Sequence, residues 1–461
     1  MNRMFKSLLI GILCVCAVAL VVHAAWNLIA SRALMRTLHT QAREGLPMNL
    51  RDIVPPPVPA NENAMPLLKA AAQAMADEAG VAQYKPAIAE LLEYRIPCTS
   101  AEASGKDPRA LETPAKEALR QKLALPEVTV VFQFLDQAAH KPRCDFALDY
   151  SRGATILLPH LSQVRNAVRL LALRAYLRAE ADPGAAMDDI RTALRIANFL
   201  RDEPFLVTHL VRVSCNATAT AALGYILNET RPEAIPPRQA EALLAQLDAQ
   251  ADPRNRSLVN AFDGARIILG KQTFEAMLIG QTDPAVVRSL GDQVESPALW
   301  LGLYGSRFGR VVIRPLLKDD FRCYMDVMRE YRSRAEQSYW DAAAQPSTMK
   351  RVSVTCTLTR NLVPVLDTCL LGAAQDRAAI YLARVGLMLA LDCRAKSRYP
   401  ASLADVPGGA PKDPFSGKDF VYHPTSAGYV LYSVGPDLKD NAGQGSFADP
   451  RSPDIVWRIG K

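Results

Sequence analysis

The chain has 461 residues, which is too long for one small core and enough for two or three folded units. Hydrophobic residues make up 49% and charged residues 22%, a balance that excludes a largely disordered chain. The net charge is +7, but no dense run of Lys and Arg occurs. We therefore expect no nucleic acid among the partners.

A long apolar stretch opens the chain. Ser7 to Val22 contains no charged residue, and the apolar character continues to Ala30. That length is enough for one helical crossing of a bilayer. A secretory signal is the alternative, since the residues up to Ala24 are similar to a small-residue cleavage site. Because the apolar stretch continues past that site, we predict an uncleaved anchor over residues 1–30.

An anchor and a signal both direct export, so we expect the bulk of the chain to be extracytoplasmic. The expected location is the inner (cytoplasmic) membrane, with the membrane itself as one partner. Basic residues flank the span on both sides, with Arg3 and Lys6 before it and Arg32 and Arg36 after it. This weak charge asymmetry does not set the orientation by itself.

Residues 31–62 are expected to join the anchor to the folded body. Leu28 to Leu46 has the pattern of a juxtamembrane helix. Val54 to Pro59 then has four prolines in six residues, which excludes a helix and predicts a stiff spacer that lifts the body from the membrane. Asn63 follows as the expected cap of the next helix.

Helical periodicity dominates residues 63–350. A typical apolar stripe with spacings of three and four consists of Leu161, Val164, Val168, Leu171 and Ala175. Strand-like alternation is hard to find before residue 350, and Val352 to Val365 has no clear period. A strong helix is predicted from Asp376 to Lys396. We therefore predict a mainly α fold of stacked helical hairpins.

One hairpin, Leu170 to Ala197, resembles a tetratricopeptide unit. The order of small and large residues in its second half fits that repeat. Two positions depart from the repeat, with Arg174 in place of a small residue and Asn198 in place of a proline. No second copy occurs one period away, so a generic helical hairpin is the alternative. In either case, stacked hairpins bury an apolar core and leave a groove.

Residues 351–461 are expected to form a helix and a small β module. Gly, Pro, Asp, Tyr and Ser become frequent after Lys396. Short strands are predicted at Asp419–Tyr422, Tyr429–Tyr432 and Asp454–Ile459, the first two joined as a hairpin.

This C-terminal stretch resembles the end of the major pseudopilins of type II secretion systems. The matching pieces occur in the same order over about 64 residues, which predicts a similar α+β module. They are Arg398-Tyr399-Pro400, Pro411-Lys412-Asp413-Pro414-Phe415, Tyr429 to Ser433, Gly435-Pro436-Asp437 and Asp454-Ile455-Val456-Trp457. The N-terminus departs from the family, because no glutamate lies in the apolar stretch. Processing and polymerisation as a pilin are therefore not expected.

The resemblance implies a calcium ion in the loop before the last strand. Asp437 and Asp454 match the ligand positions best, Asp440 and Ser433 match less well, and Asp449 is ambiguous. Calcium takes six to eight oxygen ligands from carboxylates and carbonyls, which suits such a loop. The alternative is that these aspartates cap turns.

Seven cysteines lie outside the apolar stretch, and none has the Cys-x-x-Cys spacing of a zinc site. We interpret them as small buried residues, with one or two disulfides as the alternative in an oxidising compartment. They are Cys98, Cys144, Cys215, Cys323, Cys356, Cys369 and Cys393.

No pattern of residues indicates a known catalytic site. Ser347 and Lys350 have the spacing of penicillin-binding enzymes, but the companion motifs of that family do not follow. Asp188 and Asp189 suit the start of a helix better than a catalytic pair. The segment from Arg143 to Asp145 is expected to pack as a loop, with a place in a polar groove as the alternative.

We therefore expect a membrane-anchored extracytoplasmic scaffold that binds a protein partner, linked to a secretion or envelope assembly. An envelope hydrolase without a recognised motif is the alternative. Polar groups converging in one deep pocket would favour the enzyme, and a shallow apolar groove would favour the scaffold. The sequence identifies no small-molecule substrate.

Overall fold

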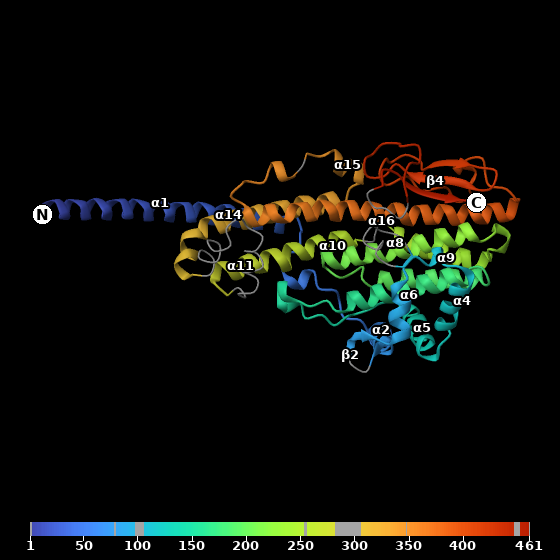
Figure 1. The fold of residues 1–461 in the computed structure, drawn as a ribbon. Coiled ribbons are helices and arrows are strands. Elements are labelled where there is room, and N and C mark those ends of the chain that lie inside the picture. Colours follow the sequence, from blue (N-terminus) through green and yellow to red (C-terminus); the bar gives the residue numbers. More distant parts are fainter. Residues whose placement is uncertain are drawn as a thin grey trace.

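The computed structural model describes residues 2–77, 80–96, 106–252, 256–281, 306–346, 348–446 and 452–460. Over this part, the protein is mainly helical, with a two-stranded sheet near the N-terminus and a three-stranded sheet at the C-terminus (Figure 1). The α-helices are α1 Asn2–Arg43, α2 Met65–Met75, α3 Pro86–Glu93, α4 Thr113–Leu123, α5 Pro126–Ala139, α6 His160–Arg178, α7 Pro183–Asn198, α8 Leu206–Glu229, α9 Pro237–Ala251, α10 Ser257–Gly264, α11 Gln272–Ile279, α14 Arg307–Ala335, α15 Tyr339–Ala344 and α16 Thr357–Lys396. The strands are β1 Ala76–Asp77, β2 Gly80–Tyr84, β3 Val421–Pro424, β4 Tyr429–Ser433 and β5 Ile455–Ile459.

α1 is one unbroken helix of 42 residues, and its N-terminal part projects alone from one end of the molecule (Figure 1). The apolar side chains from Phe5 to Val22 are exposed. The helix is long and apolar enough to cross a membrane. α8 also meets this criterion of length and composition, but most of its apolar window is buried inside the body, which is typical of a core helix.

The second half of α1 lies against α14. Lys318 on α14 donates to Asn27 Oδ1 and to Ser31 Oγ, each at 2.7 Å. Further along, Leu34 is buried in a core with residues of α10, α14 and α16. The expected juxtamembrane helix is therefore the continuation of the apolar helix, docked on the body.

A buried polar network holds the end of α1. The Gln41 side chain is fully buried, donates to the Met325 carbonyl at 3.0 Å, and accepts from Arg266 Nη1 at 2.9 Å. Arg266 lies on a π-helical segment, Ala265–Lys271, between α10 and α11, and also donates to the Pro47 carbonyl. Because both side chains are out of reach of water, each depends on the other for its hydrogen bonds.

The proline-rich segment does not separate the body from α1. Residues 54–58 line a cavity of about 590 Å³ together with the loop from Lys141 to Tyr150. The expected spacer is thus a strap across the body, while the docked half of α1 makes the connection to the apolar helix. Asn63 is not the N-cap of α2 as expected, since that position is Ala64; instead its Oδ1 accepts from the amides of Met65 and Asp145 and ties the start of α2 to the loop after α5.

The predicted helical hairpin is formed by α6 and α7, which pack on each other and on α8. Arg174, which departs from the tetratricopeptide pattern, donates through Nε to Asp189 Oδ2 at 3.1 Å. Arg178 reaches the same carboxyl group at 2.7 Å. A buried ion pair between the two helices therefore replaces the small residue of that repeat.

The C-terminal sheet has the antiparallel order β3-β4-β5 and packs on α8 and α16. Trp457 on β5 is buried between Gly224 of α8 and Gly386 of α16. Because it belongs to the same core as α6, α7 and α8, the boundary expected at residue 350 does not separate two cores.

Two elements differ from the expectations. β1 and β2 form an antiparallel hairpin before residue 350, where no strand was predicted. α16 begins at Thr357, well before the predicted start at Asp376. Its first part buries Leu358, Leu366 and Cys369 in a core with residues of α14, while Val365 is exposed, so its apolar residues do not all lie on one face.

Candidate functional site

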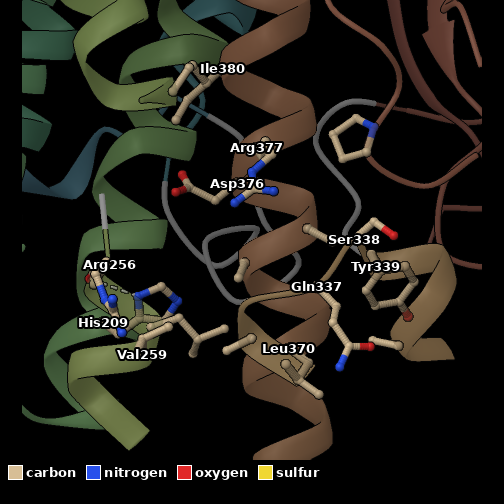
Figure 2. A pocket seen from close by; sticks show the side chains of 18 of the residues that line it. His209, Arg256, Val259, Gln337, Ser338, Tyr339, Leu370, Asp376, Arg377 and Ile380 are labelled. Carbon is tan, nitrogen blue, oxygen red and sulfur yellow. Dashed lines mark hydrogen bonds between the residues drawn. The ribbon is translucent and has the colours of Figure 1, made fainter. Parts of the chain in front are cut away.

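A polar cavity of about 260 Å³ lies where the helical body, α14 and the C-terminal module meet (Figure 2). Its wall comes from α8, the end of α9, α10, the end of α14, α15 and α16, with Lys412 and Pro414 from the C-terminal module. At this cavity, α14, which packs on α1, the helical body and the C-terminal module contribute to one concave surface.

A buried charged network forms one side of this cavity. Arg212 on α8 lies 3.6 Å from Asp376 on α16, measured from Nη1 to Oδ2. Asn216 Nδ2 donates to the same carboxyl group at 3.0 Å, and Arg212 Nη2 donates to Gln250 Oε1 at 2.9 Å. Burial raises the pKa of Asp376, while the guanidinium of Arg212 acts in the opposite direction. The network ties α8, α9 and α16 together at the cavity wall.

His209 lies one helical turn before Arg212 and is buried beside it. Its Nδ1 lies 3.0 Å from Ser257 Oγ at the start of α10. Its Nε2 is buried and has no hydrogen-bond partner among the described residues. Burial, with a smaller contribution from Arg212, lowers the pKa of His209 to about 3, so the ring is neutral at pH 7.

The exposed edge of the cavity is basic. Figure 2 shows Arg256 and Arg377 on either side of the space, with Tyr339 facing them from α15. Arg256 pairs with Glu336 at 2.9 Å. Arg377 is exposed, although it follows the buried Asp376 directly on α16. Asp252 also lines the cavity, so the positive charge that an acidic group from solvent would meet comes mainly from the exposed Arg377.

The residues of this cavity were not among the sequence-based candidates. They come from several helices that are far apart in the chain, so no local motif marks them. A charged residue inside a predicted helix is the one signal that could have indicated this site. Asp376 gave no such signal, because it was placed at the expected start of its helix and interpreted only as a boundary.

The loop between β4 and β5 brings three of the predicted calcium ligands together. Asp454 is fully buried and accepts from the Gly443 amide at 2.8 Å. Burial raises its pKa, and the nearby charges of Asp440 and Asp437 act in the same direction. Asp437 itself accepts from Asn441 Nδ2 at 2.9 Å, and Asp440 accepts from Tyr432 Oη at 3.0 Å.

The fourth predicted ligand points elsewhere. Ser433 Oγ donates to Asp413 Oδ1 at 2.7 Å, and the Asp413 carboxylate also accepts from Ser416 Oγ and from two backbone amides. Asp449 lies outside the described residues. Within the described part, no three acidic, His or Cys side chains stand at metal-ligand distances. A calcium ion here would therefore need backbone carbonyls as well as Asp437, Asp440 and Asp454.

The other candidate residues from the sequence show no arrangement of a catalytic site within the described residues. Asp189 is buried in the ion pair with Arg174 and Arg178, so it is not a helix-start charge as expected. The segment from Arg143 to Asp145 lines the cavity of about 590 Å³ under the proline-rich strap. Ser347 lies outside the described residues.

No family model matches the chain, and no curated protein or solved structure is significantly similar to it.

Proposed function

We propose that the protein is a membrane-anchored extracytoplasmic scaffold that holds an acidic segment of a protein partner in the cavity of Figure 2. The observation that carries the proposal is the position of this cavity, at the junction of the anchor-docked helix, the body and the C-terminal module. A ligand there contacts all three parts at once. The resemblance of the C-terminal module to pseudopilins supports a partner from a secretion or envelope assembly.

Charge supports an acidic partner. The edge of the cavity has Arg256, Arg377 and Lys412, and Arg212 lies behind them in the wall. Arg256 and Lys412 are neutralised in part by Glu336 and Asp419. The exposed Arg377 is the group best placed to meet a carboxylate, since it stands at the surface.

A photo-crosslinking residue at Gln337, an exposed position that lines the cavity, tests the proposal in detergent-solubilised membranes. We expect a protein adduct that is lost in the charge-reversal variant Arg377→Glu. The matched control is the same crosslinker at Lys69, an exposed position on α2 far from the cavity (Figure 1). Equal adducts at positions 337 and 69, or none at position 337, would contradict the scaffold proposal.

Location is tested separately with an impermeant maleimide on intact spheroplasts of the host. An added cysteine at Lys439, on the C-terminal loop, should react if the body is extracytoplasmic. An added cysteine at Asn2, before the apolar stretch, should be protected until the membrane is opened. The reverse pattern would place the body in the cytoplasm.

Hydrolysis is the second candidate, because Ser257 and His209 form a hydrogen-bonded pair in the cavity wall. General bases work best with a pKa near the operating pH, and the pKa of His209 is about 3. A histidine with such a low pKa is a weak base at neutral pH, so the pair favours binding over hydrolysis. A fluorophosphonate probe that labels the wild type but not Ser257→Ala would reverse that preference.

Calcium binding in the loop before β5 is part of the same proposal. Asp437, Asp440 and Asp454 would hold the ion, which would neutralise three carboxylates that otherwise repel one another. The ion would fix the loop on β5 and thereby the edge of the C-terminal module.

A further inference from the structure

Two thiols meet where α14 contacts the start of α16. Cys323 lies on α14, and Cys356 is the residue before the first turn of α16. The two side chains are close enough for each to shift the pKa of the other. Both lie at an open cavity of about 850 Å³, where Cys323 is partly exposed and a reagent from solvent can reach it, whereas Cys356 is buried behind it.

The backbone around this pair is held by an independent set of contacts. Asp320 on α14 accepts from the Leu358 amide at 2.9 Å and from the Thr359 amide at 3.1 Å, and so caps α16 from the neighbouring helix. Cys323 follows Asp320 by three residues and therefore lies on the same face of α14. Cys356 Sγ also lies 3.9 Å from the Asp319 carbonyl oxygen. These contacts hold the start of α16, with Cys356, against the part of α14 that carries Cys323.

We propose that Cys323 and Cys356 form a redox-active pair that closes to an intramolecular disulfide between α14 and α16. The oxidant is a disulfide, either of a protein thiol oxidase or of a small thiol such as glutathione. Cys323 attacks one sulfur of that disulfide, forms a mixed disulfide and expels one thiolate. Cys356 then gives up its proton, attacks the Cys323 sulfur and expels the second thiolate. The pair loses two electrons and two protons, and the oxidant gains two electrons and leaves as two thiols.

The electrostatics fit these roles. The interaction with Cys356 lowers the pKa of Cys323, which makes Cys323 the better attacking thiol, whereas the same interaction raises the pKa of Cys356. Cys356 also stands at the N-terminus of a 40-residue helix, where backbone dipoles favour a developing negative charge. Cys369 gives a contrast on the same helix, because burial alone raises its pKa.

The disulfide would join two parts that the cavity of Figure 2 also joins. α14 packs on α1, and α16 forms one wall of the cavity and supports the C-terminal sheet. Oxidation would therefore fix the anchor-docked helix to the helix that positions Asp376 and Arg377. The inference needs neither the partner nor the acidic ligand of the proposed function.

The purified full-length protein in detergent is the sample for the test. It is equilibrated with reduced or oxidised glutathione, denatured, and labelled with a maleimide that adds mass at each free thiol. We expect the oxidised wild type to carry two fewer labels than the reduced one, and the bridged peptides to contain residues 323 and 356. Cys369→Ser should show the same loss of two labels, and Cys323→Ser should lose none. Cys356→Ser should lose one label, because Cys323 then stays as the mixed disulfide with glutathione.

Equal labelling of oxidised and reduced wild type would overturn the inference, as would a loss of two labels that persists in Cys323→Ser. Acid-quenched cells give a second measurement with the same labels. If the two cysteines form the disulfide with glutathione in vitro but are reduced in cells, the result would support the disulfide and contradict the extracytoplasmic location. If the disulfide is present in cells, the result supports the disulfide and the extracytoplasmic location.

Discussion

Trp457 couples the C-terminal sheet to the helical body, and Gly386→Ala should weaken that coupling. A methyl group at position 386 would lie 2.6 Å from Cζ3 and 2.9 Å from Cε3 of the Trp457 ring, closer than packed atoms tolerate. Crowding of this kind costs about 1–3 kcal/mol. Replacing a glycine by alanine within a helix contributes about 1 kcal/mol in the opposite direction. The net expectation is a loss of stability of up to about 2 kcal/mol.

Gly372→Ala is the matched control on the same helix. There the added methyl group would meet Leu210 Cδ2 at 3.7 Å, an ordinary contact, so only the helix-forming gain of about 1 kcal/mol remains. The two variants should therefore differ by about 1–3 kcal/mol, with Gly386→Ala the less stable.

Thermal melts followed by circular dichroism of the full chain in detergent measure this difference. The cost of Gly386→Ala should shrink in a Trp457→Leu background, because the smaller side chain leaves room for the methyl group. If Gly386→Ala melts at or above Gly372→Ala, or if its cost is unchanged in that background, the tight contact between Trp457 and α16 is wrong.

Three further predictions concern the anchor junction, the cavity and the loop. Gln41→Ala should lower the unfolding free energy by at least about 2 kcal/mol, because it leaves the buried Arg266 guanidinium and the Met325 carbonyl without this partner. In urea unfolding, the control Gln73→Ala, at an exposed site of α2, should change the unfolding free energy by less than about 0.5 kcal/mol. The pKa of His209 falls from 6.5 to about 3 on folding, so the unfolded chain takes up a proton below pH 6.5 that the folded protein does not, and the unfolding free energy decreases as the pH falls. Between pH 7 and pH 5, the unfolding free energy of the wild type should fall by about 2 kcal/mol more than that of His209→Gln, and parallel pH profiles would contradict this. Calcium at ten times its dissociation constant should stabilise the protein by about 1.4 kcal/mol, measured by thermal melts with calcium and with a chelator. Asp437→Asn should remove this effect and Asp419→Asn should keep it, and a wild type whose melting does not respond to calcium would contradict the proposal for the loop.

The helical class and the last three strands, with the first two paired as a hairpin, could be predicted because they depend on local patterns. The spacing of Leu161, Val164 and Val168 marks the buried face of α6, and the aromatic and aliphatic run of Tyr429 to Tyr432 after a turn-rich loop marks β4. The first part of α16 was missed because Val352 to Val365 is rich in residues that favour strands, and its helical form depends on contacts with α14 and the body.

The cavity could not be predicted for a related reason. Arg212, Gln250 and Asp376 come together only through the packing of α8, α9 and α16. Each residue alone has the pattern of a solvent-facing charge on a helix. Asp437 and Asp454 were named through the resemblance to pseudopilins, and calcium binding by their loop stays a prediction.

The docking of α1 on α14 has a mechanical consequence. A flexible tether would let the body tumble, whereas a helix that continues from a bilayer into the body leaves it free to turn mainly about the membrane normal. With the exposed apolar part to Val22 in a bilayer, the helix rises a further 30 Å or so before it ends at Arg43, at about 1.5 Å per residue. The cavity would thus be presented at one height and one tilt, so that an encounter with another membrane-bound protein becomes a search in two dimensions.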